Sequence, residues 1–125
     1  MEDVKRWLPV VGYAALIFYF SSRQGQELPR WELMTHDKIL HAIEYAGLGL
    51  LLARALGAGR WWLAVVIAIA FGVSDEFHQS FVPHRNGNDL GDLTADLTGA
   101  LLGAAAWVAR TRLLRQPRAD GTHRA

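Results

Sequence analysis

Four apolar stretches alternate with short polar segments along the chain. Three of them carry no charge, at residues 7–22, 61–74 and 97–109, and a fourth, residues 39–53, is interrupted by His41 and Glu44. The runs LPVVGYAALIFYF and WWLAVVIAIAFGV are apolar on every side, without the polar stripe of a soluble amphipathic helix. Extended through its polar end, each run reaches about 19 to 21 residues, enough to cross ~30 Å of hydrocarbon.

This pattern predicts an all-α fold, an integral membrane bundle of four transmembrane helices near residues 6–22, 37–56, 60–80 and 89–110. The links are a polar segment, residues 23–36, the short Gly57-Ala58-Gly59, and a third segment with Pro83 and Asn86-Gly87-Asn88. The short glycine link predicts a tight hairpin. A small soluble helical bundle is the alternative, but each of its helices would need a polar face.

Length and composition narrow the class of protein. The chain has 125 residues, 51% of them hydrophobic, which allows one domain, residues 1–115, and a polar tail, residues 116–125, that we expect to be disordered. Cys is absent, which excludes disulfides and thiolate metal sites, and the formal net charge of +1 argues against nucleic acid as a partner. The N-terminus resembles a signal peptide, but SSRQGQE lacks a small-x-small cleavage site, so we expect a retained first span.

The charged residues divide between the two ends of the predicted bundle. Nine of the thirteen Lys and Arg fall at the termini and beside the hairpin link: Lys5, Arg6, Arg54, Arg60, Arg110, Arg112, Arg115, Arg118 and Arg124. The positive-inside rule therefore predicts that both termini are cytoplasmic. Nine of the twelve acids fall in the opposite half or its links: Glu27, Glu32, Asp37, Glu44, Asp75, Glu76, Asp89, Asp92 and Asp96.

Ionisable residues gather at the outer ends of three predicted helices. Residues three or four apart share a helix face, and four such groups occur: Asp37 with His41, Glu44 and Tyr45; Asp75 with His78; Glu76 with Gln79; and Asp92 with Asp96. Such groups are costly in a membrane unless they face one another, a cavity or a partner. We interpret them as a polar pocket that opens outward. The alternatives are helix-to-helix hydrogen bonds and, for Glu27, Glu32, Asp89 and Asp92, solvation at the surface.

A seam of small residues marks one face of the fourth predicted helix. Gly99 and Gly103 form a GxxxG pattern, and Ala95 extends it by one turn outward. Small residues at this spacing let helix backbones approach closely in lipid. Because Asp96 lies one turn above the two glycines on the same face, we expect its side chain to point into the bundle.

The order of these residues resembles the VanZ-like family of small bacterial membrane proteins. The matching features are Asp37-Lys38 with His41 and Tyr45, then Asp75-Glu76-x-His78-Gln79-x-Phe81 with Pro83 and Arg85, then Asp92 and the helix with Gly99. The resemblance implies a multi-span protein of the bacterial cytoplasmic membrane, in a family whose named member is associated with resistance to the glycopeptide antibiotic teicoplanin. Asp96 departs from the family, where we expect Asn, which implies that this acid is protonated or paired.

Three functions fit the predicted pocket. The first is an enzyme acting on a lipid-linked envelope precursor, with Asp75 or Glu76 as general base and His78 or His41 as general acid or ligand. Its substrate-binding residues would be the anion clamp Arg85 and Lys38, together with Gln79, Asp37, Tyr45, Asp92 and Asp96. The second is a non-catalytic protein that holds a lipid head group or a glycopeptide. The third, proton or ion movement, is disfavoured because the inner half offers no polar path.

The sequence assigns no metal, although one arrangement would suit a divalent ion. The pair Asp75-x-x-His78 is similar to the carboxylate-x-x-His pairs of metal sites in helix bundles, and His with carboxylate ligands suits Zn, Mn or Fe. No HExxH motif and no matched second repeat accompany it. A bound metal would use Asp75, His78 and His41.

Overall fold

Four long helices make up the part of the chain that the structure, a computed structural model, describes. It describes residues 2–21, 30–81 and 90–115, with the side chains of residues 30–37 and 79 outside that description. The elements are α1 (Glu2–Ser21), α2 (Arg30–Leu56), the short 3-10 helix η1 (Ala58–Arg60), α3 (Trp61–Gln79) and α4 (Leu90–Arg115). The all-α prediction is confirmed for these residues. The predicted tail, residues 116–125, lies outside them.

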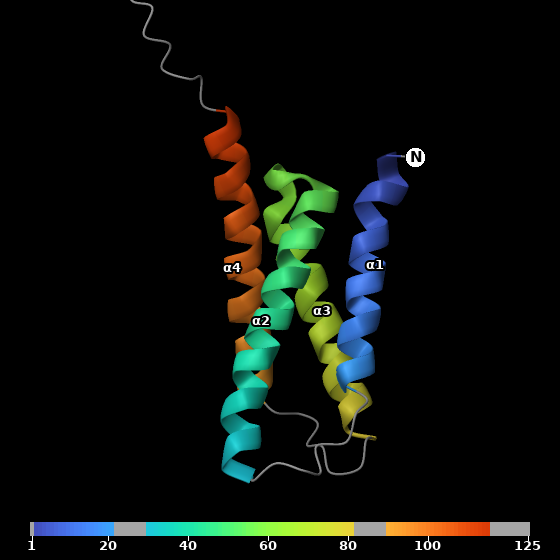
Figure 1. Cartoon of the computed structure of the whole chain (residues 1–125), viewed down its shortest axis with the longest axis vertical. Coiled ribbons are helices and arrows are strands. Elements are labelled where there is room, and N and C mark those ends of the chain that lie inside the picture. Colours follow the sequence, from blue (N-terminus) through green and yellow to red (C-terminus); the bar gives the residue numbers. More distant parts are fainter. Residues whose placement is uncertain (1, 22–29, 82–89, 116–125) are drawn as a thin grey trace, which may run out of the picture.

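The helices run side by side and alternate in direction (Figure 1). The N-terminal end of α1, the turn between α2 and α3 and the C-terminal end of α4 lie at one end of the bundle, which we call the hairpin end. The C-terminal ends of α1 and α3 lie at the other end, with the first turns of α2 and α4 (Figure 1). We call this second end the acidic end.

Three helices are longer than the sequence pattern predicted, and the first of them, α1, begins at Glu2 rather than near residue 6. α2 begins at Arg30 rather than near residue 37, and α4 ends at Arg115 rather than near residue 110. Residues 30–36, RWELMTH, follow Pro29 and include the good helix formers Arg, Glu, Leu and Met. The polarity of residues 23–36 therefore led to a predicted link that was too long, because helix propensity does not require an apolar sequence.

The tight hairpin between α2 and α3 is confirmed. Gly57 has φ 100° and ψ 148°, a backbone conformation that strains residues with a Cβ. Its amide donates to the carbonyl of Ala53 at 2.9 Å, and the amide of Arg60 donates to the carbonyl of Gly57 at 2.9 Å. These bonds end α2 and lead through η1 directly into α3.

α2 and α4 make the closest helix contact. At three glycines of this interface an added Cβ would overlap a carbonyl oxygen of the facing helix: Gly99 on Ala42, Gly103 on Ala46, and Gly49 on Ala100. The backbones can meet because these positions carry no side chain. The seam predicted from Gly99 and Gly103 is therefore a true helix contact, and α2 is its partner.

Apolar side chains fill the bundle beyond the acidic end. The core includes Leu48 and Leu52 of α2, Ala64 and Ala68 of α3 and Ala104 of α4, all buried. α1 joins it through Val10 and Ile17. Two described segments, Lys38–Leu56 and Ala58–His78, are long and apolar enough to cross a membrane by length and composition.

Valine at position 103 should disrupt this packing. In Gly103→Val the branched side chain meets the Ala46 carbonyl. We therefore expect the free energy of unfolding to fall by about 1–3 kcal/mol or more. Gly12→Val is the matched control, since a Cβ at Gly12 of α1 meets nothing within 4 Å. Denaturant unfolding of the purified proteins, followed by circular dichroism, measures both. Equal effects of the two substitutions would show that α2 and α4 do not meet at Gly103.

Candidate functional site

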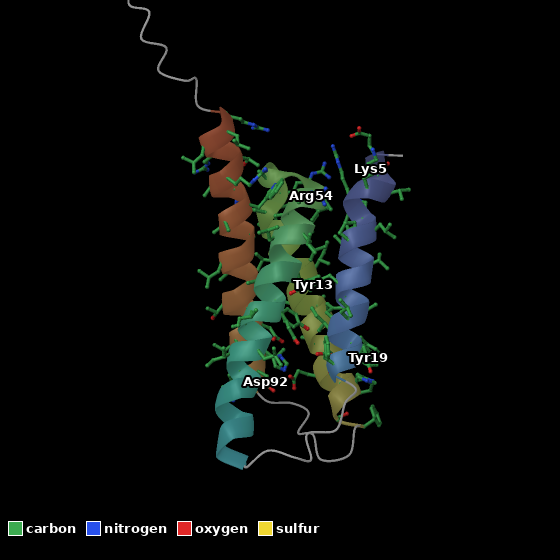
Figure 2. All side chains as sticks on the ribbon, in the orientation of Figure 1. Lys5, Tyr13, Tyr19, Arg54 and Asp92 are labelled. Atoms are coloured by element: carbon green, nitrogen blue, oxygen red, sulfur yellow. The ribbon has the colours of Figure 1, made fainter. Side chains whose placement is uncertain are left out.

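The buried polar side chains of the described residues all belong to the half of the bundle at the acidic end. They come from all four helices: Ser21 of α1, His41 of α2, Asp75 and Glu76 of α3, and Asp92 and Asp96 of α4. Figure 2 shows Asp92 near this end, while Lys5 and Arg54 lie at the hairpin end. The predicted collection of polar groups in one half is therefore present among these residues, and we call it the acidic site.

His41 and Asp96 form a hydrogen bond at the centre of the acidic site. His41 Nδ1 lies 2.7 Å from Asp96 Oδ1, and the two residues are 3% and 0% exposed. An ionised carboxylate only accepts, so the Nδ1–H of the imidazole donates and Nε2 is directed to the opposite side of the ring. The pairing explains how an acid is accommodated where the family resemblance led us to expect Asn.

Three potential metal ligands from three helices lie next to this pair. One ligand atom each from His41, Glu76 and Asp92 fall within 4.8 Å of one another, and all three residues are buried. A Zn²⁺ ion binds its ligands at about 2.0–2.2 Å, so the group would contract around a bound ion. The group shares His41 with the set named from the sequence, but it contains Glu76 and Asp92 in place of Asp75 and His78.

Asp92 is buried, which argues against surface solvation, the alternative named for it from the sequence. It lies in the first turn of α4, on the face that continues through Asp96, Gly99 and Gly103 toward α2. Lys38 Nζ lies 3.8 Å from Asp92 Oδ1, with the Lys38 side chain 39% exposed. Lys38 therefore lies at the exposed edge of the acidic site.

Tyr45 and Gly72 line the inner side of the acidic site. Tyr45 is fully buried, and its ring lies parallel to that of His41, with centroids 6.3 Å apart. A Cβ on Gly72 would lie 2.9 Å from Asp96 Oδ2 and 3.5 Å from the Tyr45 hydroxyl, so this glycine leaves space for both groups. Sequence reasoning missed Gly72, since a lone glycine in an apolar run gives no signal of what faces it.

The Tyr45 hydroxyl and Asp75 Oδ1 are buried, with no hydrogen-bond partner among the described residues. Asp75 itself lies near Ser21 of α1 and within electrostatic range of His41 and Asp96. A buried polar atom without a partner costs about 1–3 kcal/mol, and native proteins keep few of them outside sites that bind water, ions or ligands. Ser21 was also missed, because it reads as the polar end of an apolar run.

The other predicted site residues lie at the edge of the acidic site or outside the described residues. His78 is half-buried and stacks on Phe18 of α1, with ring centroids 4.1 Å apart and an interplanar angle of 26°. Glu44 is half-buried on α2. The side chains of Asp37 and Gln79 and the whole of Arg85 lie outside the description. The structure thus unites His41, Tyr45, Asp75, Glu76, Asp92 and Asp96.

Comparison with known proteins gives one result. A model of the VanZ/LLP1 family matches residues 5–114. The matched range takes in all six buried polar residues of the acidic site and nearly the full length of the four helices. No curated protein and no solved structure matches the chain.

A double-mutant cycle should detect the hydrogen bond between His41 and Asp96. We expect His41→Ala and Asp96→Ala each to lower the free energy of unfolding by about 1–3 kcal/mol, because each leaves a buried polar group unpaired. The double variant should lose less than the sum, by about 0.5–3 kcal/mol. As a control, Asp96→Ala combined with Thr111→Ala, near the far end of α4, should be additive. Additive effects in the first pair would contradict the contact.

Proposed function

The chain belongs to the VanZ-like family, and from this premise we propose that it is a four-span protein of the bacterial cytoplasmic membrane that binds the head group of an envelope amphiphile. One observation carries the proposal: three helices bring His41, Asp75, Glu76, Asp92 and Asp96 together in a buried site at one end of an otherwise apolar bundle. Intramembrane ionisable groups that face one another mark functional sites.

The outer surface of the helices supports a membrane location. Large apolar side chains are exposed on all four: Leu8, Leu16 and Phe20 on α1; Ile39, Leu40 and Ile43 on α2; Trp62, Val66 and Val73 on α3; and Leu97, Leu101 and Leu102 on α4. Water-soluble monomers seldom expose so much apolar surface, whereas lipid stabilises it. With 20 residues in α1 and 26 in α4, both helices are also long enough to span ~30 Å.

The charges support an orientation with the acidic site near the outer face. Lys5 and Arg54 lie at the hairpin end (Figure 2), where positive side chains favour the cytoplasm. Trp61 and Trp62 begin α3 at the same end and are exposed, as is usual for indoles at a membrane interface. The acidic site then lies toward the exterior, where lipid-linked precursors of the cell wall are used.

The surroundings of the acidic site suit a molecule with an apolar tail. Phe77 and Phe81 are exposed and pack edge to face at the end of α3, with centroids 5.2 Å apart. On α1, Phe18 and Phe20 are exposed at the same end. An acyl or prenyl chain can therefore stay in the bilayer against these rings while its head group enters beside Lys38. Retention of such a molecule would be the basis of resistance to teicoplanin, the role that the family resemblance implies.

Chemical conversion of the bound molecule is the second candidate function. The observation that favours it is the bond between Asp96 and His41, because a carboxylate that fixes one ring nitrogen orients the other for proton transfer. Asp75 and Glu76 lie buried on the adjacent helix, where either carboxylate is placed to act as a base. Binding of the amphiphile's head group without conversion is the first proposal.

Envelope lipids retained during purification test the proposed function. We expect mass spectrometry to detect a tightly bound amphiphile in the wild-type protein and much less in Asp75→Asn or Glu76→Gln. Asp3→Asn is the matched control, since Asp3 is exposed on α1 at the hairpin end. If binding alone confers resistance, cells that express the variants with less bound amphiphile should be more susceptible to teicoplanin than cells that express the wild type. Wild-type retention in both site variants, at equal protein levels, would contradict the proposal.

Reporter fusions test the proposed topology independently. A reporter inserted at Ala58 should show that this position faces the cytoplasm. A reporter inserted after residue 85 should show that that position faces the exterior. The expectation follows from the hairpin between α2 and α3 and from the positive residues near it. If both positions were found on the same side of the membrane, the four-span arrangement would be wrong.

A further inference from the structure

We propose that His41, Glu76 and Asp92 bind one divalent transition-metal ion, such as Zn²⁺ or Mn²⁺. The three residues come from α2, α3 and α4, and their ligand atoms already lie within 4.8 Å of one another. Each residue is 3% exposed, so its side chain is held by the packing of the helices rather than by solvent. A preformed group of one nitrogen and two carboxylate donors needs only small rotations to surround an ion.

Asp96 supplies the support that a histidine ligand requires. Metal-binding histidines donate their second ring N–H to a carboxylate or a carbonyl, which fixes the tautomer and makes the ligating nitrogen more basic. His41 Nδ1 makes this bond to Asp96 Oδ1 at 2.7 Å, and in the proposed site Nε2 would bind the ion. The bond is a second observation, independent of the spacing of the three ligands, that points to metal binding.

The charge of the acidic site favours a cation. Asp75, Glu76, Asp92 and Asp96 are all 3% exposed or less, and among the described side chains Lys38 brings one positive charge to Asp92. Carboxylates collected in a poorly solvated site repel one another when they are ionised, and a dication would offset two of their charges. This inference rests on the proposed function, because the ion would also give an anionic head group a favourable partner in a site of carboxylates.

The ligand types select the kind of metal. Ca²⁺ and Mg²⁺ prefer oxygen ligands alone, whereas imidazole with carboxylate suits Zn²⁺, Mn²⁺ or Fe²⁺. Three protein ligands leave at least one coordination position for water or a ligand oxygen. The Tyr45 hydroxyl and Asp75 Oδ1 are buried and have no hydrogen-bond partner among the described residues. Both atoms would gain a partner if a bound water or ligand oxygen reached them.

Metal binding to the purified, chelator-treated protein tests the proposal. Titration with ZnCl₂ and MnCl₂, followed by calorimetry and elemental analysis, should show one equivalent of at least one ion bound more tightly than MgCl₂. Glu76→Gln and Asp92→Asn should each weaken binding by at least tenfold, and Asp96→Asn by about 10–100-fold. Asp3→Asn, at an exposed position of α1 at the hairpin end, should leave binding unchanged. Circular dichroism and size-exclusion chromatography establish that each variant is folded.

Several results would overturn the proposal. They are the absence of stoichiometric binding in the wild type, binding unaffected by Glu76→Gln and Asp92→Asn, or binding lost only in Asp75→Asn and His78→Asn. If a variant does not fold, X-ray absorption of the Zn-loaded wild type decides: one imidazole with oxygen ligands is expected, and an all-oxygen shell contradicts it. If the purified protein retains the amphiphile but binds no metal, this inference is wrong and the proposed function stands. If it binds one equivalent of metal but no amphiphile, the proposed function is wrong instead.

Discussion

The contact of the α2 and α4 backbones is the constraint on which the acidic site depends. An aspartate side chain carries its carboxylate on a single methylene, so Asp96 reaches His41 at 2.7 Å only if the two helix axes lie unusually close. Gly99 and Gly103 allow that approach, because a Cβ at either position would overlap a carbonyl of α2. The same seam places Asp92 beside Lys38 at the next turn. One row of residues on α4 therefore determines both how closely α2 and α4 pack and where the carboxylates of the acidic site lie.

The division of the bundle into an apolar half and a polar half follows from the same arrangement. Beyond the seam the interior is filled by residues such as Leu48, Leu52 and Ala68, which offer no partner to an ionisable group. Toward the acidic end, α3 adds two carboxylates and a glycine, Gly72, that leaves room beside Asp96. Ionisable side chains buried together in an otherwise apolar bundle are typical of a functional site.

Much of this could be predicted from the sequence, for identifiable reasons. Four apolar runs fixed the number of helices, the Gly57 link fixed the hairpin, and the step from Asp96 to Gly99 and Gly103 indicated which face of the last helix turns inward. All of these depend on local periodicity. The start of α2 at Arg30 was missed, because a polar sequence with good helix formers reads as a link.

The partners across helices were beyond prediction for a different reason. Periodicity tells which residues share a face, but not which turn of one helix meets which turn of another. That relative register decides that Asp92 is buried, that Glu76 approaches His41 and Asp92, and that His78 stacks on Phe18. The set named for a metal from the sequence therefore differed in two of its three members. Spacing within one helix had favoured Asp75 with His78, whereas the structure favours neighbours from three helices.

Nuclear magnetic resonance of the purified protein with ¹⁵N-labelled histidine tests the central claim most directly. The claim is that the backbone seam holds His41 against Asp96 in a site shielded from water. Comparison with His41→Gln assigns the imidazole. The account predicts an Nδ1 proton that exchanges slowly, resonates far downfield, and is lost in Asp96→Ala but retained in Asp3→Asn. A His41 ring whose protons exchange as fast as those of free histidine would contradict it.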